Sequence, residues 1–326
     1  ATSSAADRVR EPGWGLPTTT TEEAVRPDPN DDEAEVEKRE ESKALDTIGA
    51  GVIACRPMTF PSFSAATAVV PDPDLPGRWS GNVEAGWDVV GNAHGGYLLS
   101  IAARALTSAT ERPDPVTITA HYLSPGRPGP VTVDTTVLRA GRRFATANAT
   151  VIAGDRPLLA VLGTFGDLGD EVRGPELVSG GPPDLPAPDD CVRVVPGDPF
   201  PPAFMAKVDL RLHPDDARFL GGTRSGTPRI RGWFRLLDDE PMTTNSLLCA
   251  VDAFPPTIFN SDLPIGWTPT VELTAHVRAR PEPGWMACGF TTMFVSGGFL
   301  EADGEIWDRT GRLVAQSRQL ALVPRS

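Results

Sequence analysis

The segment Tyr97–Ala109 has the sequence YLLSIAARALTSA and directly follows a pair of glycines, Gly95 and Gly96. Its apolar residues fall on nearly every face of a helix. A helix that is apolar all round must be buried all round. We therefore expect one enclosed helix here, with the remainder of the fold wrapped around it.

Short segments of alternating polarity follow this helix. They are rich in Val and Thr and are separated by turn signals such as Pro125-Gly126 and Gly154-Asp155, a pattern typical of antiparallel strands. The predicted strands are Val116–Tyr122, Val131–Leu138, Ala145–Ile152 and Leu158–Phe165. One enclosed helix followed by about four strands indicates an α+β unit.

The same pattern occurs a second time along the chain. Leu98–Ala103 (LLSIAA) recurs as Leu247–Asp252 (LLCAVD), and Thr119–His121 (TAH) recurs as Thr274–His276. Three strand-like segments follow the second copy: Trp285–Val295, Phe299–Asp308 and Leu313–Val323. We therefore predict a duplication, with a first unit at 51–168, a Pro/Gly-rich linker at 169–197 and a second unit at 198–326.

Residues 1–50 differ in character from the rest. They carry 13 acidic and 6 basic side chains, which is more than half of the net charge of −13. Too little apolar area is present there to offset the entropy of ordering, so we expect a flexible extension, with binding of a partner as an open alternative. The acidic balance of the whole chain disfavours nucleic-acid binding.

The four cysteines, Cys55, Cys191, Cys249 and Cys288, are far apart and form no CxxC pair. A zinc or redox site of that kind is therefore not expected, and the cysteines are interpreted as buried small hydrophobes. No apolar run approaches the ~18 residues of a membrane span, and no secretory signal is recognisable. We expect a cytoplasmic protein without metal or bound cofactor.

Several strings of residues resemble the acyl-CoA thioesterase II family. Gly91–Tyr97 (GNAHGGY) is similar to the His-Gly-Gly entrance of the central helix in hotdog thioesterases. Second-half motifs of the family are matched by Ala250–Phe254 (AVDAF), Thr270–Thr274 (TVELT) and Gly311–Gln319 (GRLVAQSRQ). The resemblance extends from about Phe60 to Val323 outside the linker. It implies a double hotdog, in which each of two tandem units has a long central helix wrapped by an antiparallel sheet.

The resemblance also implies an activity, the hydrolysis of a fatty or other acyl-CoA to free acid and CoA. In that family an Asp on the second helix, a Thr on the next strand and a Gln on the last strand hold the attacking water. By motif these are Asp252, Thr270 and Gln319. Thr274 stays an alternative to Thr270, because period-two alternation predicts that both lie on one strand face together with Glu272.

These residue types suit thioester hydrolysis. A carboxylate, an amide and a hydroxyl can hold and activate one water. The Gly95 and Gly96 N–H groups at the start of a buried helix, with His94, could receive the developing oxyanion. The second copy has Thr243–Asn245 in place of His94–Gly96, and the first copy has Ala103 in place of Asp252. We therefore predict one complete composite site and one degenerate site.

Weaker substrate contacts are predicted at Asn92, Tyr97 and Thr274, and at Arg142 and Arg143, which could bind the phosphates of CoA. Solvated arginines at a hairpin are the alternative for this last pair. Asp252 could instead cap a backbone group, Gln319 could satisfy a sheet edge, and His94 could bind its own loop.

The residues support three rival functions less well. A serine esterase is excluded because the chain has no GxSxG motif. A hotdog enoyl-CoA hydratase or dehydratase would use an Asp and a His, and Asp209 and His213 are its weak candidates. A non-catalytic acyl-binding or scaffold protein is the third reading. A homo-oligomer formed through the backs of the sheets is a further expectation. The sequence leaves open the acyl chain length and whether the carrier is CoA or an acyl carrier protein.

Overall fold

The computed structural model describes residues 61–169, 175–198, 200–238 and 240–324, which all belong to one compact unit, Phe60–Ser326. The predicted extension, residues 1–50, lies outside the described residues. None of the helices described there is long and apolar enough to cross a membrane. Cys191, Cys249 and Cys288 are buried and free, as predicted, while Cys55 lies outside the described residues.

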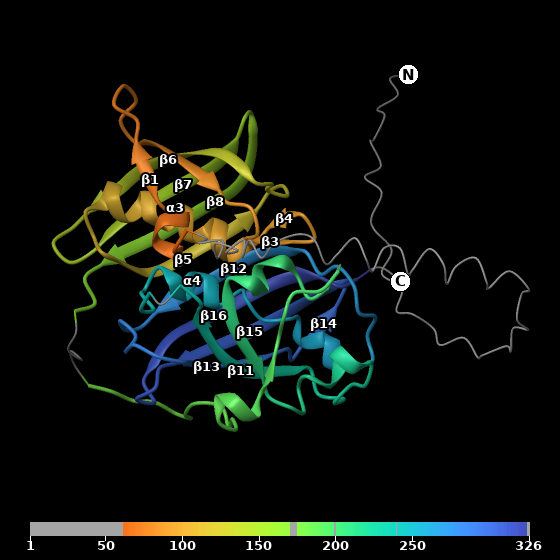
Figure 1. Cartoon of the computed structure of the whole chain (residues 1–326). Helices are drawn as coiled ribbons and strands as arrows, with labels where there is room; N and C mark the ends of the chain where they lie inside the picture. Colours follow the sequence, from red (N-terminus) through yellow and green to blue (C-terminus); the bar gives the residue numbers. More distant parts are fainter. Residues whose placement is uncertain (1–60, 170–174, 199, 239, 325–326) are drawn as a thin grey trace, which may run out of the picture. The chain divides into compact units, whose positions relative to one another are not determined.

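One antiparallel sheet of 14 strands contains both copies of the repeat (Figure 1). The first half contributes β1 Val69–Pro71, β2 Arg78–Val83, β5 Asp114–Tyr122, β6 Gly129–Ala140, β7 Ala145–Ala153 and β8 Arg156–Gly166. The second contributes β9 Val192–Arg193, β10 Val208–Leu212, β11 Arg229–Leu236, β12 Thr270–Val277, β13 Met286–Thr291, β14 Val295–Ser296, β15 Phe299–Trp307 and β16 Leu313–Leu322. A separate two-stranded sheet pairs β3 Asp88–Val89 with β4 Asn92–Ala93.

The strand order shows the duplication directly. Strands β5 and β12 pair at the centre, with Thr119 opposite Thr274. From β5 the order outward is β8, β7, β6, β2 and β1, and from β12 it is β16, β15, β13, β11, β10 and β9. The predicted strands of the first half are confirmed, as are Phe299–Asp308 and Leu313–Val323 of the second, whereas the predicted strand Trp285–Val295 divides into β13 and β14. Two residues of the predicted linker, Val192 and Arg193, form the edge strand β9.

Helix α3, Gly95–Thr110, is the enclosed helix predicted from Tyr97–Ala109. It begins at His94, whose side chain accepts from the Tyr97 N–H, and it ends at Glu111 in the left-handed conformation. It packs against β5, β6, β7 and β8. Its fully buried apolar residues point in several directions around the axis, as an enclosed helix requires: Leu99, Ile101, Ala102, Ala103, Ala105 and Leu106.

The prediction of a long central helix in the second half is wrong. The helix there, α4, has only five residues, Ser246–Ala250. The chain leaves it in tight turns, and Pro255 and Pro256 follow, which lack an N–H and disfavour helix at the preceding residue. A 3-10 turn, η5, occupies Thr257–Asn260. The remaining short elements are α2 Phe63–Ala66, η2 Pro188–Asp190, η3 Ala203–Ala206 and η4 Arg218–Gly221.

The short helix nevertheless packs directly on α3 (Figure 1). Gly96 lies at the contact. A Cβ added to Gly96 would lie 2.6 Å from the Leu248 carbonyl oxygen and 3.0 Å from the Cys249 Cα. The start of α3 and the end of α4 can therefore approach this closely only because residue 96 has no side chain. Asp252, in the turn just after α4, is brought to the start of α3 by this approach.

Gly96→Ala should lower the free energy of unfolding by about 1–3 kcal/mol, because the added methyl must push α3 away from the α4 backbone. Gly221→Ala is the matched control, since a Cβ there would meet nothing within 4 Å. Urea denaturation of both variants measures the difference. Equal stability of Gly96→Ala and the unmodified protein would contradict the close approach.

Candidate active site

Asp252 joins the two halves of the chain. Its Oδ2 accepts a hydrogen bond of 2.7 Å from the Gly96 N–H at the start of α3. Its Oδ1 lies 3.2 Å from the Gln319 Nε2, which donates to it from the last strand, β16. Only 11% of its side chain is exposed. The carboxylate is therefore buried but hydrogen-bonded on both oxygens, as a buried charge requires.

Gln319 and Thr270 lie on neighbouring strands beside this carboxylate. Gln319 is opposite Leu273 in the pairing of β16 with β12, and Thr270 is opposite Ala321. The Gln319 Nε2 also donates to the Thr270 Oγ1. The structure thus brings together Asp252, Gln319 and Thr270, the three residues predicted to hold water.

The predicted common face of Thr270, Glu272 and Thr274 is wrong. A β-bulge interrupts the pairing after Thr270, so that Glu272 pairs with Leu320 instead of continuing the alternation. Glu272 and Thr274 therefore point to the other side of the sheet. There the Thr274 hydroxyl donates to Glu272 at 2.5 Å and lies 2.8 Å from the Thr119 hydroxyl. Thr274 does not join the site.

His94 holds the backbone of the site. Its Nδ1 accepts from the Tyr97 N–H at 3.1 Å, so the proton is on Nε2, which donates to the Asp252 carbonyl oxygen at 2.9 Å. The ring is 2% exposed and packs on Phe204 with ring centroids 4.4 Å apart. Both ring nitrogens are used within the protein. The expectation that His94 polarises the substrate is therefore wrong, and the alternative, a bond to its own loop, describes half of what it does.

Only one of the two predicted backbone donors, the Gly95 and Gly96 N–H groups, is left to bind an oxyanion. The Gly96 N–H is engaged by Asp252. The Gly95 N–H has no acceptor among the described residues. A Cβ on Gly95 would lie 2.8 Å from the Asp252 Oδ2 and 2.9 Å from the Tyr122 hydroxyl oxygen. A side chain at residue 95 would therefore displace the Asp252 carboxylate or the Tyr122 phenol.

Tyr122 is a site residue that the sequence reasoning missed. It is the last residue of β5, and its hydroxyl is buried without a hydrogen-bond partner among the described residues. A signal was present in the sequence. Tyr122 directly follows the duplicated Thr-Ala-His, where the second copy has Val277, and it alternates with the core residues Ile118 and Ala120.

Burial raises the pKa of the Asp252 carboxyl above its ordinary value, although His94, the Gly96 N–H and Gln319 each oppose the shift. Burial, and then the charges of Asp252 and Glu272, hold the pKa of the Tyr122 phenol well above its ordinary value. The site therefore combines a carboxylate of increased basicity with a phenol that stays protonated.

The remaining predicted contacts lie elsewhere. Tyr97 is fully buried, stacks on Trp87 and donates its hydroxyl to the Ala66 carbonyl, so it is a core residue. Arg142 and Arg143 are exposed at the β6–β7 turn. Arg112, just past the end of α3, donates to Gly141 in this turn. The 16-residue helix separates the turn from the site by about 24 Å. The prediction for Tyr97 is therefore wrong. Arg142 and Arg143 are exposed arginines at a hairpin, which fits the alternative interpretation, and a contact between them and the CoA phosphates stays a prediction.

Asn92 is the one weaker candidate that stays near the site. It lies half-buried in β4, two residues before His94. No hydrogen bond of its side chain occurs within the described residues, so its contribution stays a prediction.

The equivalent positions in the first half hold no amide, carboxylate or hydroxyl side chain. Since β5 corresponds to β12 and β8 to β16, the pairing of Ile118 with Gly163 places Gly163 where the second half has Gln319. Ala103 and Pro115 stand in the positions of Asp252 and Thr270. A buried carboxylate, Asp114, is present nearby, but Thr244 and Arg280 both bind it.

Two family models match this chain. Residues 83–166 match the acyl-CoA thioesterase N-terminal domain, and residues 188–323 match the acyl-CoA thioesterase C-terminal domain. The chain belongs to this family. It is a double hotdog of the thioesterase II kind, as the resemblance implied.

Several known proteins match this chain over about four fifths of its length. An uncharacterised protein of Mycobacterium tuberculosis is 30% identical over 288 residues, which cover 80% of this chain and 98% of the relative. The structure of a candidate thioesterase II from Thermobifida fusca is 32% identical, with a TM-score of 0.73, over 82% of this chain and 99% of the other. An acyl-CoA thioesterase II from Mycobacterium marinum, at 17% identity and a TM-score of 0.59 over 81% of this chain and 99% of its own, shares the fold.

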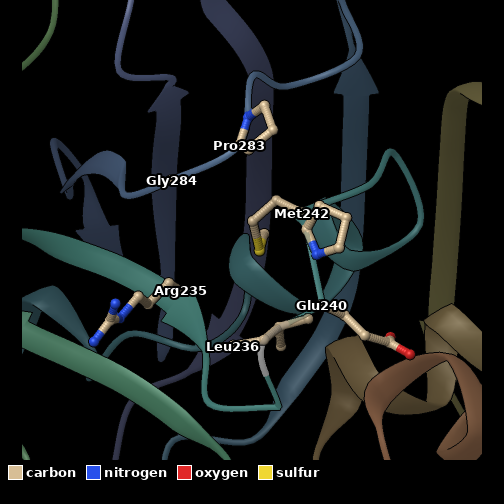
Figure 2. A pocket seen from close by; sticks show the side chains of 7 residues that line it. Arg235, Leu236, Glu240, Met242, Pro283 and Gly284 are labelled. Atoms are coloured by element: carbon tan, nitrogen blue, oxygen red, sulfur yellow. The ribbon is translucent and has the colours of Figure 1, made fainter.

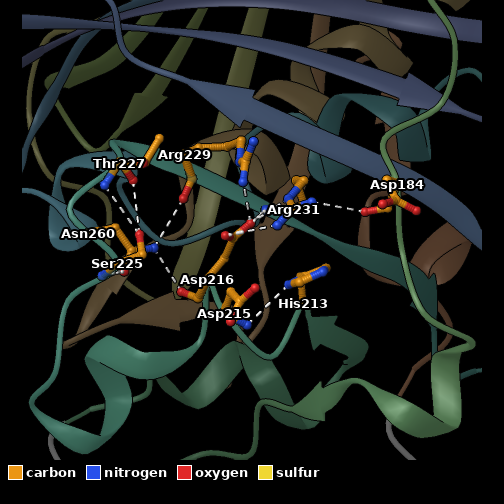
Figure 3. Close-up of polar contacts among 9 residues, drawn as sticks. All are labelled: Asp184, His213, Asp215, Asp216, Ser225, Thr227, Arg229, Arg231 and Asn260. Atoms are coloured by element: carbon orange, nitrogen blue, oxygen red, sulfur yellow. Dashed lines mark hydrogen bonds and ion pairs between the residues drawn. The ribbon is translucent and has the colours of Figure 1, made fainter.

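The residues suspected of hydratase chemistry are engaged in structural contacts of the thioesterase fold. Asp209 is buried and forms ion pairs with three arginines, Arg193, Arg211 and Arg235. The His213 Nδ1 accepts from the Asp215 N–H, next to the buried pair of Asp216 and Arg231 (Figure 3). Asp209 and His213 therefore form no common site.

A pocket lies just before α4 (Figure 2). Its lining residues are Arg235, Leu236, Glu240, Pro241, Met242, Pro283 and Gly284. Arg235 is paired with Asp209, and Glu240 accepts hydrogen bonds from Ser64. None of the predicted site residues lines this pocket, which lies before the start of α4, whereas Asp252 follows the end of α4.

The raised pKa of Asp252 predicts a specific dependence of stability on pH. A carboxyl whose pKa is raised in the folded state stabilises the fold below its unfolded pKa of about 3.9, and this contribution is lost as the pH rises through the folded pKa. Asp252→Asn retains the shape and an acceptor for the Gly96 N–H but cannot ionise. The variant should therefore gain stability relative to the unmodified protein as the pH rises from about 4, up to a plateau. Urea denaturation over this range measures the difference; a difference independent of pH would contradict the raised pKa.

Proposed function

We propose that this protein hydrolyses acyl-CoA thioesters to free acid and CoA, with water as nucleophile, at one composite site between the two halves. The observation that carries the proposal is the Asp252 carboxylate, which is held between the Gly96 N–H of the first half and the Gln319 amide of the second. Membership of the acyl-CoA thioesterase family supports the reaction class.

The first step is the activation of water. Asp252 Oδ1, Gln319 and Thr270 form one hydrogen-bonded row. A water at this row can donate one proton toward the carboxylate while its other contacts fix its orientation. Because burial raises the pKa of Asp252, the carboxylate is a better base than an exposed aspartate at the same site.

The chemical steps then balance without metal or cofactor. The water oxygen forms a bond to the thioester carbonyl carbon, one water proton passes to Asp252, and the carbonyl oxygen takes the electron pair. When the tetrahedral intermediate collapses, the C–S bond breaks and the CoA sulfur takes the proton from Asp252. The start of α3 lies beside the carboxylate, where the positive end of the helix dipole favours the oxyanion.

The arrangement of the two copies supports a single site per chain. The first half supplies the glycine pair and the second half the carboxylate, the amide and the hydroxyl. The other combination has Thr243–Asn245, Ala103 and Gly163 at the corresponding positions. Such complementary losses have no explanation in core packing, but they follow if one site was retained. The two matching family models, both of acyl-CoA thioesterases, support CoA as the acyl carrier.

Asp252→Asn should lower kcat for thiol release by about 100-fold or more, because the amide cannot take a proton from water. A panel of acyl-CoAs of increasing chain length reads out the preferred substrate at the same time. Asp155→Asn is the matched control, since Asp155 is exposed in the β7–β8 turn. Full activity of Asp252→Asn would place the reaction elsewhere, and inactivity of the unmodified protein on every acyl-CoA would favour a binding or scaffold role.

The β-bulge makes a second pair of variants informative. Thr270→Val should lower kcat/KM about tenfold, the scale of one lost hydrogen bond, because the hydroxyl faces Gln319. Thr274→Val, on the same strand, should leave kcat/KM unchanged, because its hydroxyl lies on the other side of the sheet. Steady-state thiol release distinguishes the two, and equal losses would contradict the assignment of Thr270.

A further inference from the structure

The proposed reaction needs donors for the oxyanion, and the backbone supplies fewer than a glycine pair suggests. Of the two N–H groups at the start of α3, the Gly96 N–H is bound by Asp252 at 2.7 Å. The only other N–H of the pair is that of Gly95, and one donor is half of the usual set. His94 has no free ring nitrogen. A second donor must come from another element.

We infer that the Tyr122 hydroxyl is this second donor, so that the Gly95 N–H and the Tyr122 phenol together bind the thioester carbonyl oxygen and stabilise its negative charge. This inference rests on the proposed thioester hydrolysis. It assigns a catalytic residue outside the water-binding group of Asp252, Thr270 and Gln319. Tyr122 comes from the first half, from which the glycine pair also comes.

The position of the hydroxyl supports this role. A Cβ added to Gly95 would lie 2.9 Å from the Tyr122 oxygen and 2.8 Å from the Asp252 Oδ2. The phenol and the carboxylate therefore meet on the same side of Gly95. A thioester carbonyl brought to Gly95 would therefore meet the phenol hydroxyl close to the carboxylate that is proposed to activate the water.

The lack of a partner supports it as well. A buried hydroxyl without a hydrogen bond is costly and rare. Within the described residues, Tyr122 is one of four residues with a buried side-chain atom of this kind, and it alone borders Asp252 and Gly95. A substrate carbonyl would satisfy it.

The protonation state fits a donor. Burial and the charges of Asp252 and Glu272 keep the phenol protonated far above neutral pH. The phenol donates a hydrogen bond without transferring its proton, so the proton balance of the reaction is unchanged. The other tyrosine of the chain, Tyr97, has a different environment, since its hydroxyl is satisfied by Ala66 and Glu84.

The test compares Tyr122→Phe with Tyr97→Phe. Tyr122→Phe should lower kcat about 100-fold, the usual effect of removing one oxyanion donor, with little change in KM. Its unfolding free energy should be unchanged or higher, because no hydrogen bond of the free protein is lost. Tyr97→Phe should do the reverse, lowering stability while the folded protein retains its kcat. A kcat of Tyr122→Phe within threefold of the unmodified protein would overturn the inference.

A second readout does not depend on turnover. In the Asp252→Asn background, the infrared carbonyl stretch of a bound, 13C-labelled acyl-CoA should lie at lower frequency than in solution, and Tyr122→Phe should remove a large part of this shift. A kcat loss with an unchanged carbonyl stretch would place Tyr122 on the water instead and overturn the inference. If Asp252→Asn abolishes hydrolysis but Tyr122→Phe changes neither kcat nor the carbonyl stretch, the inference about Tyr122 is wrong and the thioesterase proposal still holds. If the unmodified protein hydrolyses no acyl-CoA, both fall.

Discussion

The hydrogen bond from the Gly96 N–H to the Asp252 carboxylate is the interaction on which the rest of the site depends. It exists because a glycine at the start of α3 allows the α4 backbone to approach within contact distance. The His94 ring fixes the same approach by binding both the α3 start and the Asp252 carbonyl. The bond also holds the buried carboxylate in its ionised form, against the desolvation that raises its pKa.

The duplication places this interaction at the centre of the molecule. Strands β5 and β12 pair across the repeat, so that Tyr122 and Thr270 enter the site from neighbouring strands of different halves. Each half then needs to supply only part of the chemistry. The first half keeps a helix start with small residues and a phenol, and the second keeps the carboxylate, the amide and the hydroxyl. The short α4 is compatible with this division. The second half needs only to place Asp252 just after the end of a helix, and a short helix is enough for that.

The sequence was sufficient to predict α3 and the duplication, but it did not predict that the second helix, α4, is short, and it did not predict the local contacts of the site. The all-apolar segment predicted α3, because a helix with apolar residues on every face must be buried. The recurrence of Leu98–Ala103 predicted two related halves, because a repeated string indicates a duplicated unit. The resemblance to the acyl-CoA thioesterase II family implied that Asp252, Thr270 and Gln319 meet. The β-bulge after Thr270 could not be foreseen, since a bulge depends on the pairing of two strands, and it moved Thr274 out of the site. Nor could the occupation of His94 and the Gly96 N–H be foreseen, because both depend on a contact between distant segments.

A crystal structure of Asp252→Asn with a bound acyl-CoA tests the composite site most directly, because it shows where the thioester lies without hydrolysis. The account predicts one acyl-CoA per chain. Its carbonyl oxygen should lie within hydrogen-bond distance of the Gly95 N–H, and its carbonyl carbon should face the side chains of Gln319 and Thr270. A thioester bound at the pocket beside Met242, or at the degenerate site where Thr243–Asn245 of the second half meet Ala103 and Gly163 of the first, would contradict the account.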